Sequence, residues 1–353
     1  MGKIPKHIEI VVTNQRGLSS MSPKSRAEIQ AVLIKHYEQV DITIVNELDD
    51  LVALVARQPD LVFLGLKFVA NDRNLGLADP NKIWVSEFLE EWGIAYTGSR
   101  NPAVEFELNK DLAKQHLLDH GLRTSEFTVF REGSDQVCDD RELRYPLFVK
   151  PTNRGGGFGI DTGSMVHNFA QLQAKVTTLS STTGSDALVE EYLPGREFSV
   201  GILKQLHADG YAVMPLELVA PANAAGEYFL SGKIKTADTE HHLAVTDEVL
   251  KAKLNLLALD AFQALGAQDY GRIDIRLDAA GTPHFLEANL LPSLLDNFGN
   301  FPKTCRLNLG ISHETVITTI VNLAFARHAE AAESDDIEQT IPVIFTTSIL
   351  GTA

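Results

Sequence analysis

Short apolar runs alternate with helical segments over the first hundred residues, and this alternation constrains the fold more than any other feature of the chain. The apolar runs predict strands at residues 7–12, 40–45, 60–64 and 94–97. The segments between them predict helices at residues 23–37, 47–57 and 81–92, the first with Ser22 as N-cap and Pro23 at its first position. Because strands that alternate with helices form βαβ units, residues 1–100 are predicted to form a small doubly wound domain with a parallel sheet.

The pattern changes after residue 100, where strand segments surround a glycine-rich loop. Residues 101–200 are predicted to form a central domain, with helices at 109–120 and 169–179 and strands at 128–130 and 147–150. Residues 201–330 are predicted to form a third, mixed domain, with helices at 247–265 and 313–328 and strands at 272–277 and 284–287. Residues 331–353 are predicted as a tail, with an acidic linker over 330–338 and a last strand over 341–349 that joins a sheet edge or a partner subunit.

Composition excludes several classes of function. The formal net charge is −16, whereas binding to a nucleic-acid backbone requires a basic face. There is no run of about 18 apolar residues and no signal-peptide pattern before the first strand. Cys138 and Cys305 are the only cysteines, so neither a disulfide framework nor a thiolate metal site is expected. These features predict a soluble, acidic protein of the size of an enzyme, located in the cytoplasm and without nucleic-acid or membrane partners; composition alone indicates no chemistry.

The first candidate site is a glycine-rich loop after a strand that ends in lysine. It reads Lys150-Pro151-Thr152-Asn153-Arg154-Gly155-Gly156-Gly157-Phe158-Gly159. Glycines let backbone N–H groups approach an anion closely, and the lysine adds a positive charge. The loop has neither the lysine-serine/threonine ending of a P-loop nor the dinucleotide fingerprint. On these residues alone it is either a phosphate lid or a flexible turn.

The second candidate site combines two carboxylates and an amide. Asp274 and Glu287 are predicted to face each other across a hairpin closed by the turn Asp278-Ala279-Ala280-Gly281, and Asn289 shares a face with Glu287. Such oxygen donors suit Mg²⁺, which binds one or two carboxylates together with substrate phosphates. A solvated polar face is the alternative, although unpaired charges are costly in strands as apolar as these.

A third segment reads strand, turn, strand. It contains Glu190-Glu191-Tyr192-Leu193 and, after Gly195-Arg196, Glu197. A glutamate and backbone amides at an apolar hinge can bind an adenine amino group and ribose hydroxyls, but an ordinary hairpin would carry the same residues.

The order of these segments resembles the ATP-grasp superfamily. More narrowly, the chain resembles D-alanine–D-alanine ligases over roughly residues 7 to 325. The segments that carry the resemblance are Tyr96-Thr97-Gly98-Ser99, Tyr145-Pro146-Leu147-Phe148-Val149-Lys150-Pro151, Gly271-Arg272-Ile273-Asp274 and Leu286-Glu287-Ala288-Asn289. The resemblance implies a three-domain ATP-grasp fold with ATP held between two antiparallel sheets. It also implies an ATP-dependent ligase that joins a carboxylate to an amine through an acylphosphate and releases ADP and phosphate.

The resemblance further implies a role for each matching residue. Lys110, Lys150 and Lys233 would contact the ATP phosphates, with Lys235 as the competitor of Lys233. The loop Gly155–Gly159, including Gly156 and Gly157, would close over them. Glu190 would bind the adenine amino group, the backbone of Glu191, Tyr192 and Leu193 the ring edge, and Glu197 the ribose. Asp274, Glu287 and Asn289 would hold two Mg²⁺ ions, with Mn²⁺ as a substitute. Arg272 would face the transferring phosphate and the later oxyanion. A homodimer is also expected from the resemblance.

The sequence departs from the family's pattern at the substrate side. Gly156 and Gly157 replace a serine pair, Ile234 replaces a tyrosine after Lys233, and the first loop, residues 13–17, has no acid. Residues 64–68 and 290–297 also differ from the family's segments. Because specificity depends on a few buried polar groups, we expect a different carboxylate–amine pair. The candidate carboxylate anchors are Arg16, Lys67, Arg73 and Arg306, with solvated surface charges as the alternative.

Two other readings compete with this one. A D-alanine–D-alanine ligase proper or another ATP-grasp enzyme would share the same ATP site, and a non-catalytic relative would bind the nucleotide alone. Retention of Lys150, Arg272, Asp274, Glu287 and Asn289 together disfavours the non-catalytic relative. His241 and His242 are adjacent and lack a third ligand, so they are predicted as loop residues and not as a metal site.

Overall fold

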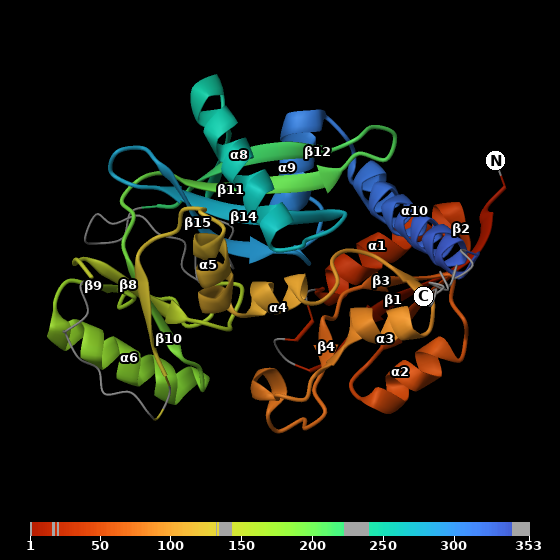
Figure 1. Ribbon diagram of the computed structural model, residues 1–353, viewed down its shortest axis with the longest axis horizontal. Coiled ribbons are helices and arrows are strands. Elements are labelled where there is room, and N and C mark those ends of the chain that lie inside the picture. The colour runs from red at the N-terminus through yellow and green to blue at the C-terminus, as the bar shows by residue number, and fades with distance from the viewer. Residues whose placement is uncertain are drawn as a thin grey trace, which may run out of the picture.

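The computed structural model describes residues 2–15, 18–19, 21–131, 133, 143–221 and 240–340, with side chains up to residue 332. Three groups of elements are visible in Figure 1, each built on its own main sheet. The N-terminal group is red to orange, the central group around α6 is yellow-green, and the C-terminal group is green to blue.

The N-terminal group is a doubly wound domain, as predicted. Its parallel sheet has the strand order β2-β1-β3-β6. The strands are β1 (Ile4–Val12), β2 (Tyr37–Ile44), β3 (Leu61–Leu64) and β6 (Ala95–Tyr96), and the helices are α1 (Pro23–His36), α2 (Leu48–Val55) and α3 (Val85–Glu91). Side chains alternate along β1, so Ile8 and Ile10 pack in one core with α1, and Val11 packs in a second core with α2 and α3. Helices therefore cover both faces of the sheet.

One predicted helix bound in this domain was wrong. The helix predicted from residue 81 begins at Val85, because Ile83 and Trp84 form strand β5 (Ile83–Trp84) and pair with β4 (Phe68–Val69). Pairing with another strand here overrides local helix propensity. The first helix ends at His36, with Tyr37 as its C-cap, which agrees with the predicted end at about residue 37. The Ser22 N-cap is confirmed, since its side chain accepts a hydrogen bond from the Ser25 N–H.

The central group is an antiparallel sheet with one covered face. Its order is β7-β10-β8-β9, and its elements are β7 (Phe127–Phe130), β8 (Leu147–Pro151), β9 (Met165–Val166), β10 (Ala187–Glu191) and helix α6 (Phe169–Thr183). Val149 and Val189 pack with the α6 residue Val176. Alternation along the strands therefore places Lys150 and Glu190 on the face away from α6.

The C-terminal group is a five-stranded antiparallel sheet in the order β13-β12-β11-β14-β15. Its strands are β11 (Glu197–Lys204), β12 (Tyr211–Val219), β13 (His241–Ala244), β14 (Tyr270–Leu277) and β15 (Pro283–Asn289), and its helices are α8 (Glu248–Ala264) and α9 (Asn300–Leu309). Phe198, Val200 and Ile202 share a core with α8. On the opposite face Gly201 lies against α9, where an added Cβ would be 2.2 Å from Thr304 Oγ1.

Two further helices pack onto this C-terminal sheet. They are α4 (Ala103–Leu108), which the prediction missed, and α5 (Lys110–Asp119), close to its predicted bounds. Ala113 and Leu117 of α5 belong to the core that contains Phe285 of β15. The domain bounds at residues 100, 200 and 330 stay predictions, but α4 and α5 are thereby attached to the sheet that carries the predicted metal ligands.

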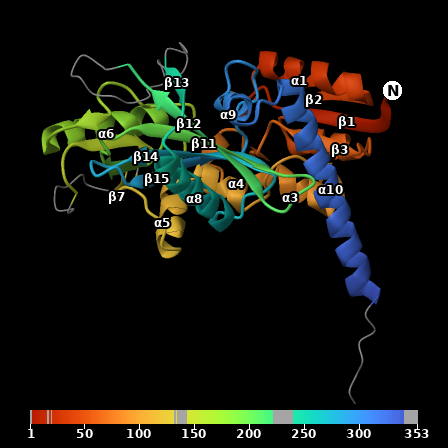
Figure 2. The ribbon, with the colours of Figure 1, turned by 90° about the horizontal axis from the view of Figure 1, so that it is seen from above.

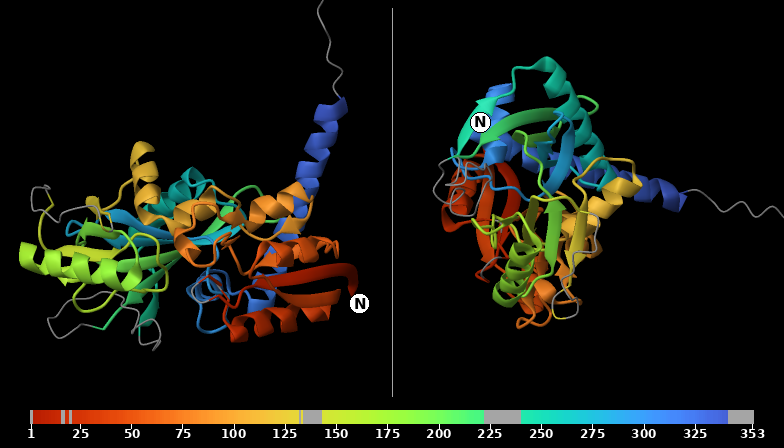
Figure 3. Two further views of the ribbon diagram at one scale, coloured as in Figure 1. Left: turned by 90° about the horizontal axis from the view of Figure 1, so that it is seen from below. Right: turned by 90° about the vertical axis from the view of Figure 1, so that its left-hand side faces the viewer.

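The predicted acidic linker is wrong. Residues 330–338 continue helix α10 (His313–Thr340), which begins in the core with Ile317 and Ile320 and then runs out from the body of the molecule (Figures 2 and 3). Alanine and glutamate have high helix propensity, so this segment extends the helix. The prediction of a loop at His241 and His242 is also wrong, since both lie in β13. The predicted strand at 341–349 lies outside the described residues.

Among the described residues no single helix is long and apolar enough to cross a membrane. One pair of helices, Asn300–Leu309 with His313–Ala332, is bent by 102° between its members. By length and composition only, this pair could cross a membrane.

Candidate active site

The hairpin of β14 and β15 brings the predicted metal ligands together. Asp274 pairs with Glu287 and Arg272 with Asn289, which confirms the predicted pairing of the two acids. One extra residue, Leu286, interrupts the register between Glu287 and Phe285. The hairpin therefore presents two carboxylates, an amide and a guanidinium at one end of two neighbouring strands.

Asp274 is the fixed centre of this group. Its Oδ1 accepts a hydrogen bond of 2.8 Å from Ser199 Oγ, and its Oδ2 accepts bonds of 3.0 Å from Arg272 Nη2 and 3.2 Å from Asn289 Nδ2. Only 4% of Asp274 is exposed. Glu287 is more open, with 22% of its side chain exposed and Lys110 Nζ at 3.6 Å from Oε2. This set of hard oxygen donors beside cationic groups fits Mg²⁺.

A buried charge triad is centred on Glu190 of the facing sheet, with Lys150 on the same sheet and Lys114 on α5. Glu190 receives Lys150 Nζ at 2.6 Å on Oε2 and Lys114 Nζ at 2.5 Å on Oε1, and Ser125 Oγ donates to Oε1 at 2.9 Å. Burial alone would raise the pKa of Glu190, but the two ammonium groups outweigh it and hold this pKa at about 2. Burial likewise opposes charge on Lys150, and the carboxylates of Glu190 and Glu287 still raise its pKa.

A small cavity of about 80 Å³ lies between the two sheets. Its lining includes Lys150, Glu190, Glu191, Tyr192, Leu193, Glu197, Asp274, Arg276 and Glu287. Arg276 organises one side of it, since Nη1 donates to Glu197 Oε2 at 2.8 Å, Nη2 to Tyr192 OH at 2.7 Å and Nε to the Leu193 carbonyl at 2.6 Å. The predicted adenine and ribose residues therefore share one cavity.

A much larger cleft of about 1680 Å³ adjoins it at Glu287, which lines both. Its lining includes Arg272 and Asn289 together with Gly155, Gly156 and Phe158 of the glycine-rich loop. Gly156, Gly157 and Gly159 have φ values of +64°, +77° and +77°, which favour glycine. Lys110 Nζ donates to the Arg154 carbonyl at 2.6 Å and so ties this loop to α5 and Glu287.

The remaining predicted residues fall into three groups. Lys233, Lys235 and Arg16 lie outside the described residues. Lys67 and Arg73 line the large cleft, where Lys67 pairs with Glu107 and Arg73 with Glu47. Arg306 is not part of the lining of either cavity and pairs with Asp296, so its predicted role as a substrate anchor has no support.

Sequence reasoning missed several residues of the site. Arg276 follows Arg272 and Asp274 at the two-residue spacing of one strand face, so the alternation along β14 could have identified it. Lys114 is one turn from Lys110 on α5, but no local pattern shows that it meets Glu190. Glu107 gave no signal in the sequence.

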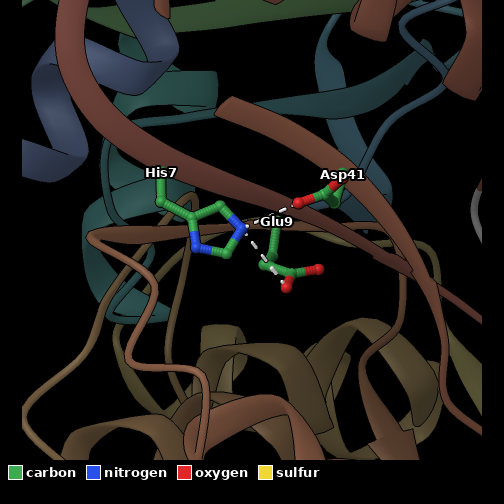
Figure 4. A group of neighbouring side chains, drawn as sticks. All are labelled: His7, Glu9 and Asp41. Atoms are coloured by element: carbon green, nitrogen blue, oxygen red, sulfur yellow. Dashed lines mark hydrogen bonds and ion pairs between the residues drawn. The ribbon is translucent and has the colours of Figure 1, made fainter. Parts of the chain in front are cut away.

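A further cluster of histidine and carboxylate side chains, close enough together to hold a metal ion, lies in the N-terminal sheet. His7 Nε2 is 3.4 Å from Glu9 Oε1 and 3.0 Å from Asp41 Oδ2 (Figure 4). Arg57 Nε also donates to Glu9 Oε1 at 2.7 Å. Because a guanidinium already occupies the buried carboxylate, we interpret this group as an ion-pair network that holds β1, β2 and the end of α2 together.

Comparison with known proteins agrees with this geometry. The model of the D-ala D-ala ligase C-terminus matches residues 117–322. The D-alanine–D-alanine ligase of Xanthomonas axonopodis pv. citri is 30% identical over 273 residues, which cover 76% of this chain and 79% of that protein. The ligase of Marinomonas sp. is 31% identical over 265 residues, covering 74% of this chain and 77% of that protein. An uncharacterized protein of Sinorhizobium fredii is 30% identical over 253 residues, covering 69% of this chain and 70% of that protein.

The fold is shared with solved structures. The crystal structure of D-alanine–D-alanine ligase from Bacillus anthracis complexed with ATP superimposes with a TM-score of 0.71 at 21% identity, covering 92% of this chain and 99% of that chain. A second structure of the same enzyme gives a TM-score of 0.73 with the same coverage. The two facing antiparallel sheets with their paired cavities thus define an ATP-grasp enzyme. The chain belongs to the D-alanine–D-alanine ligase family, and it is an ATP-dependent ligase that forms an amide bond between a carboxylate and an amine.

Proposed function

We propose that this ligase joins an amino acid, or an amino-acid-like metabolite, to an amine other than a second D-alanine. The observation that carries the proposal is the junction of the two cavities at Glu287, a predicted metal ligand that lines both the small pocket and the large cleft. The small pocket contains the residues expected to bind adenine and ribose. The large cleft has room for two organic substrates beside the phosphates.

In this proposal the nucleotide is held by the residues of the small pocket. Glu197, oriented by Arg276, binds the ribose, and the backbone of Glu191–Leu193 meets the ring edge. Glu190 offers an oxygen to the adenine amino group while keeping its lysine partners. Lys110 and Lys150 supply positive charge to the phosphates, with Lys233 as a further contact, and the glycine-rich loop lies over them.

Asp274, Glu287 and Asn289 are the residues that would hold Mg²⁺, with two ions and exchange for Mn²⁺ as the finer proposal. When bound, the metal neutralises negative charge on the transferring phosphoryl group. Arg272 is fixed by Asp274 and lines the large cleft, so its guanidinium can stabilise charge on the same group. Lys110 helps to order the loop that excludes water from the reactive acylphosphate.

The substrate carboxylate oxygen attacks the γ-phosphorus of ATP, which forms the acylphosphate and releases ADP. The acceptor amine then attacks the acylphosphate carbonyl, loses a proton to solvent, and forms the amide bond as phosphate leaves. Arg272 is again the cation placed to stabilise the oxyanion that forms. Gly156 stands in the cleft where the family's pattern has a serine, so one polar group expected to orient D-alanine is absent there. A changed set of polar groups favours a different substrate pair.

A screen of phosphate release tests the proposed function. The full-length protein with ATP and Mg²⁺ would be assayed against pairs drawn from glycine and the D- and L-amino acids. We expect at least one mixed pair to exceed two D-alanines in kcat/KM by about tenfold or more, a difference of about 1.4 kcal/mol in transition-state binding. A clear preference for two D-alanines would refute the changed specificity.

The finer proposals on assembly and compartment rest on the resemblance and on composition. We propose a homodimer located in the cytoplasm. Sedimentation velocity of the purified protein tests the first of these, and fractionation of cells that express the full chain tests the second.

A further inference from the structure

The wall of the large cleft contains an ion pair that the proposed function has not used. Lys67 lies directly before β4, and Glu107 is on α4. Lys67 Nζ is 2.7 Å from Glu107 Oε1, and the two side chains are 16% and 7% exposed. Both residues line the cleft together with Arg272. A buried ion pair that faces a substrate cleft is a candidate for substrate recognition.

The second oxygen of Glu107 has no hydrogen-bond partner. Glu107 Oε2 is buried, and nothing in the part of the chain described by the structure donates to it. Buried polar atoms are nearly always hydrogen-bonded, and an unsatisfied one is destabilising. This oxygen can therefore accept a bond from a substrate, and a positively charged donor would form the strongest bond.

Glu107 is also close to the strand that carries the reaction. Helix α4 packs against β15. Glu107 lines the large cleft together with Arg272 and Asn289 of the β14–β15 hairpin. A substrate group that reaches Glu107 can therefore belong to a molecule whose other end lies near Arg272.

We propose that Glu107 binds the α-ammonium group of the amino acid whose carboxylate is activated, and that Lys67 positions Glu107 for this contact. This inference rests on the proposed function and names its substrate class: an α-amino acid with a free ammonium, as opposed to a 2-hydroxy acid. The ammonium group has three N–H donors, and Glu107 Oε2 would accept a hydrogen bond from one of them. Lys67 retains Oε1 and keeps the carboxylate ionised and oriented.

Steady-state phosphate release by Glu107→Gln tests the inference. The assay uses the best amino acid of the wild-type screen and the 2-hydroxy acid with the same side chain and chirality. We expect KM for the amino acid to rise 10- to 100-fold with kcat changed less than threefold and KM for ATP unchanged. The hydroxy acid, which has no ammonium, should react at the same rate with both proteins.

Glu105→Gln is the matched control, because Glu105 is on the same helix but does not line the cleft. An equal loss with both acids would overturn the role of Glu107 and leave the proposed function standing. If the wild-type protein releases no phosphate with any amino acid, the proposed function itself would be refuted. If Glu107→Gln does not fold, the wild-type protein provides the test. We expect its kcat/KM for the amino acid to exceed that for the matching 2-hydroxy acid by at least 100-fold. Equal kcat/KM values for the two acids would overturn the inference.

Discussion

At the scale of single residues, Asp274 has the most demanding position in the site. Its two oxygens accept bonds from Ser199, Arg272 and Asn289 while its side chain is nearly buried. A carboxylate held from three sides keeps one orientation, which a metal ligand and a partner for Arg272 both require. The charge of Asp274, more than its shape, is therefore expected to matter for catalysis.

Asp274→Asn is predicted to lower phosphate release by roughly 100-fold or more, because it removes the carboxylate charge that would hold Mg²⁺ and so weakens neutralisation of the transferring phosphoryl group. The amide can still accept the bond from Ser199, so the unfolding midpoint should shift by only a few degrees. Asp278→Asn is the matched control, since Asp278 caps the turn of the same hairpin through Ala280 and Thr282. Full activity of Asp274→Asn, with Asp278→Asn also active, would end the metal proposal.

The lowered pKa of Glu190 predicts that the free energy of unfolding depends on pH. Its pKa is about 2 in the folded chain against 4.5 for an ordinary glutamate, because Lys114 and Lys150 outweigh the effect of burial. A lowered pKa stabilises the fold above pH 4.5, and this stabilisation is lost as the pH falls from 4.5 towards 2. Glu190→Gln should therefore cost about 3 kcal/mol at neutral pH and progressively less on acidification. Urea unfolding of both proteins from pH 7 to pH 2 measures this, and a constant difference would contradict it.

At the scale of elements, strand alternation explains why the site forms. On β10, Val189 packs with α6 whereas Glu190 belongs to the charge triad, and on β11, Val200 packs with α8 whereas Ser199 donates to Asp274. Each strand thus has one apolar face and one face for the site. The geometry of the site therefore depends on the helices that pack against these sheets.

Gly201 tests this dependence on packing, because a Cβ at this position of β11 would lie 2.2 Å from Thr304 Oγ1 of α9. Gly201→Ala is predicted to cost about 1–3 kcal/mol of unfolding free energy, since the overlap forces the helix from the sheet. Thr304→Ala should restore most of this loss in the double variant, which a double-mutant cycle by urea unfolding would measure. Additive losses in the cycle would show that the two residues do not meet.

Much of the element pattern could be predicted from the sequence. The β14–β15 hairpin with Asp274 opposite Glu287, helix α8 with its Asp247 cap, and the alternation of the first domain follow from periodicity and turn residues that are local. The acidic linker was mispredicted because charge suggested solvation, whereas the alanine and glutamate content favoured helix. Strand β5 could not be predicted, because its partner β4 is 14 residues away in the sequence and only pairing defines either strand.

At the scale of the whole molecule, the small cavity lies between two sheets that have separate cores. A ligand that contacts both sheets adds contacts that the free protein lacks. It also binds only the folded state, so it stabilises folding by mass action. The nucleotide is thus expected to act on the molecule as a link between its central and C-terminal groups.

ATP with Mg²⁺ is predicted to raise the unfolding free energy by about 2.7 kcal/mol at a ligand concentration one hundred times its Kd. Thermal unfolding at increasing concentrations of a non-hydrolysable ATP analogue measures this effect. Glu197→Gln, which removes the charge that Arg276 orients in the small pocket, should shift the curve to higher concentrations. An unfolding midpoint that does not move with nucleotide would contradict the position of the ATP site.

The sequence by itself determined most of the order of strands and helices, the resemblance to the family and a candidate set of residues for the ATP phosphates, because these depend on periodicity and on motifs of adjacent residues. The tertiary structure decided which charges lose their water. Lys114, Lys150 and Glu190 come from three different elements, and Lys67 and Glu107 from two others, so their pairing arises only when the sheets and helices pack. Desolvation is what makes such pairs strong or leaves an oxygen without a partner, and it is a property of the packed chain and not of any segment.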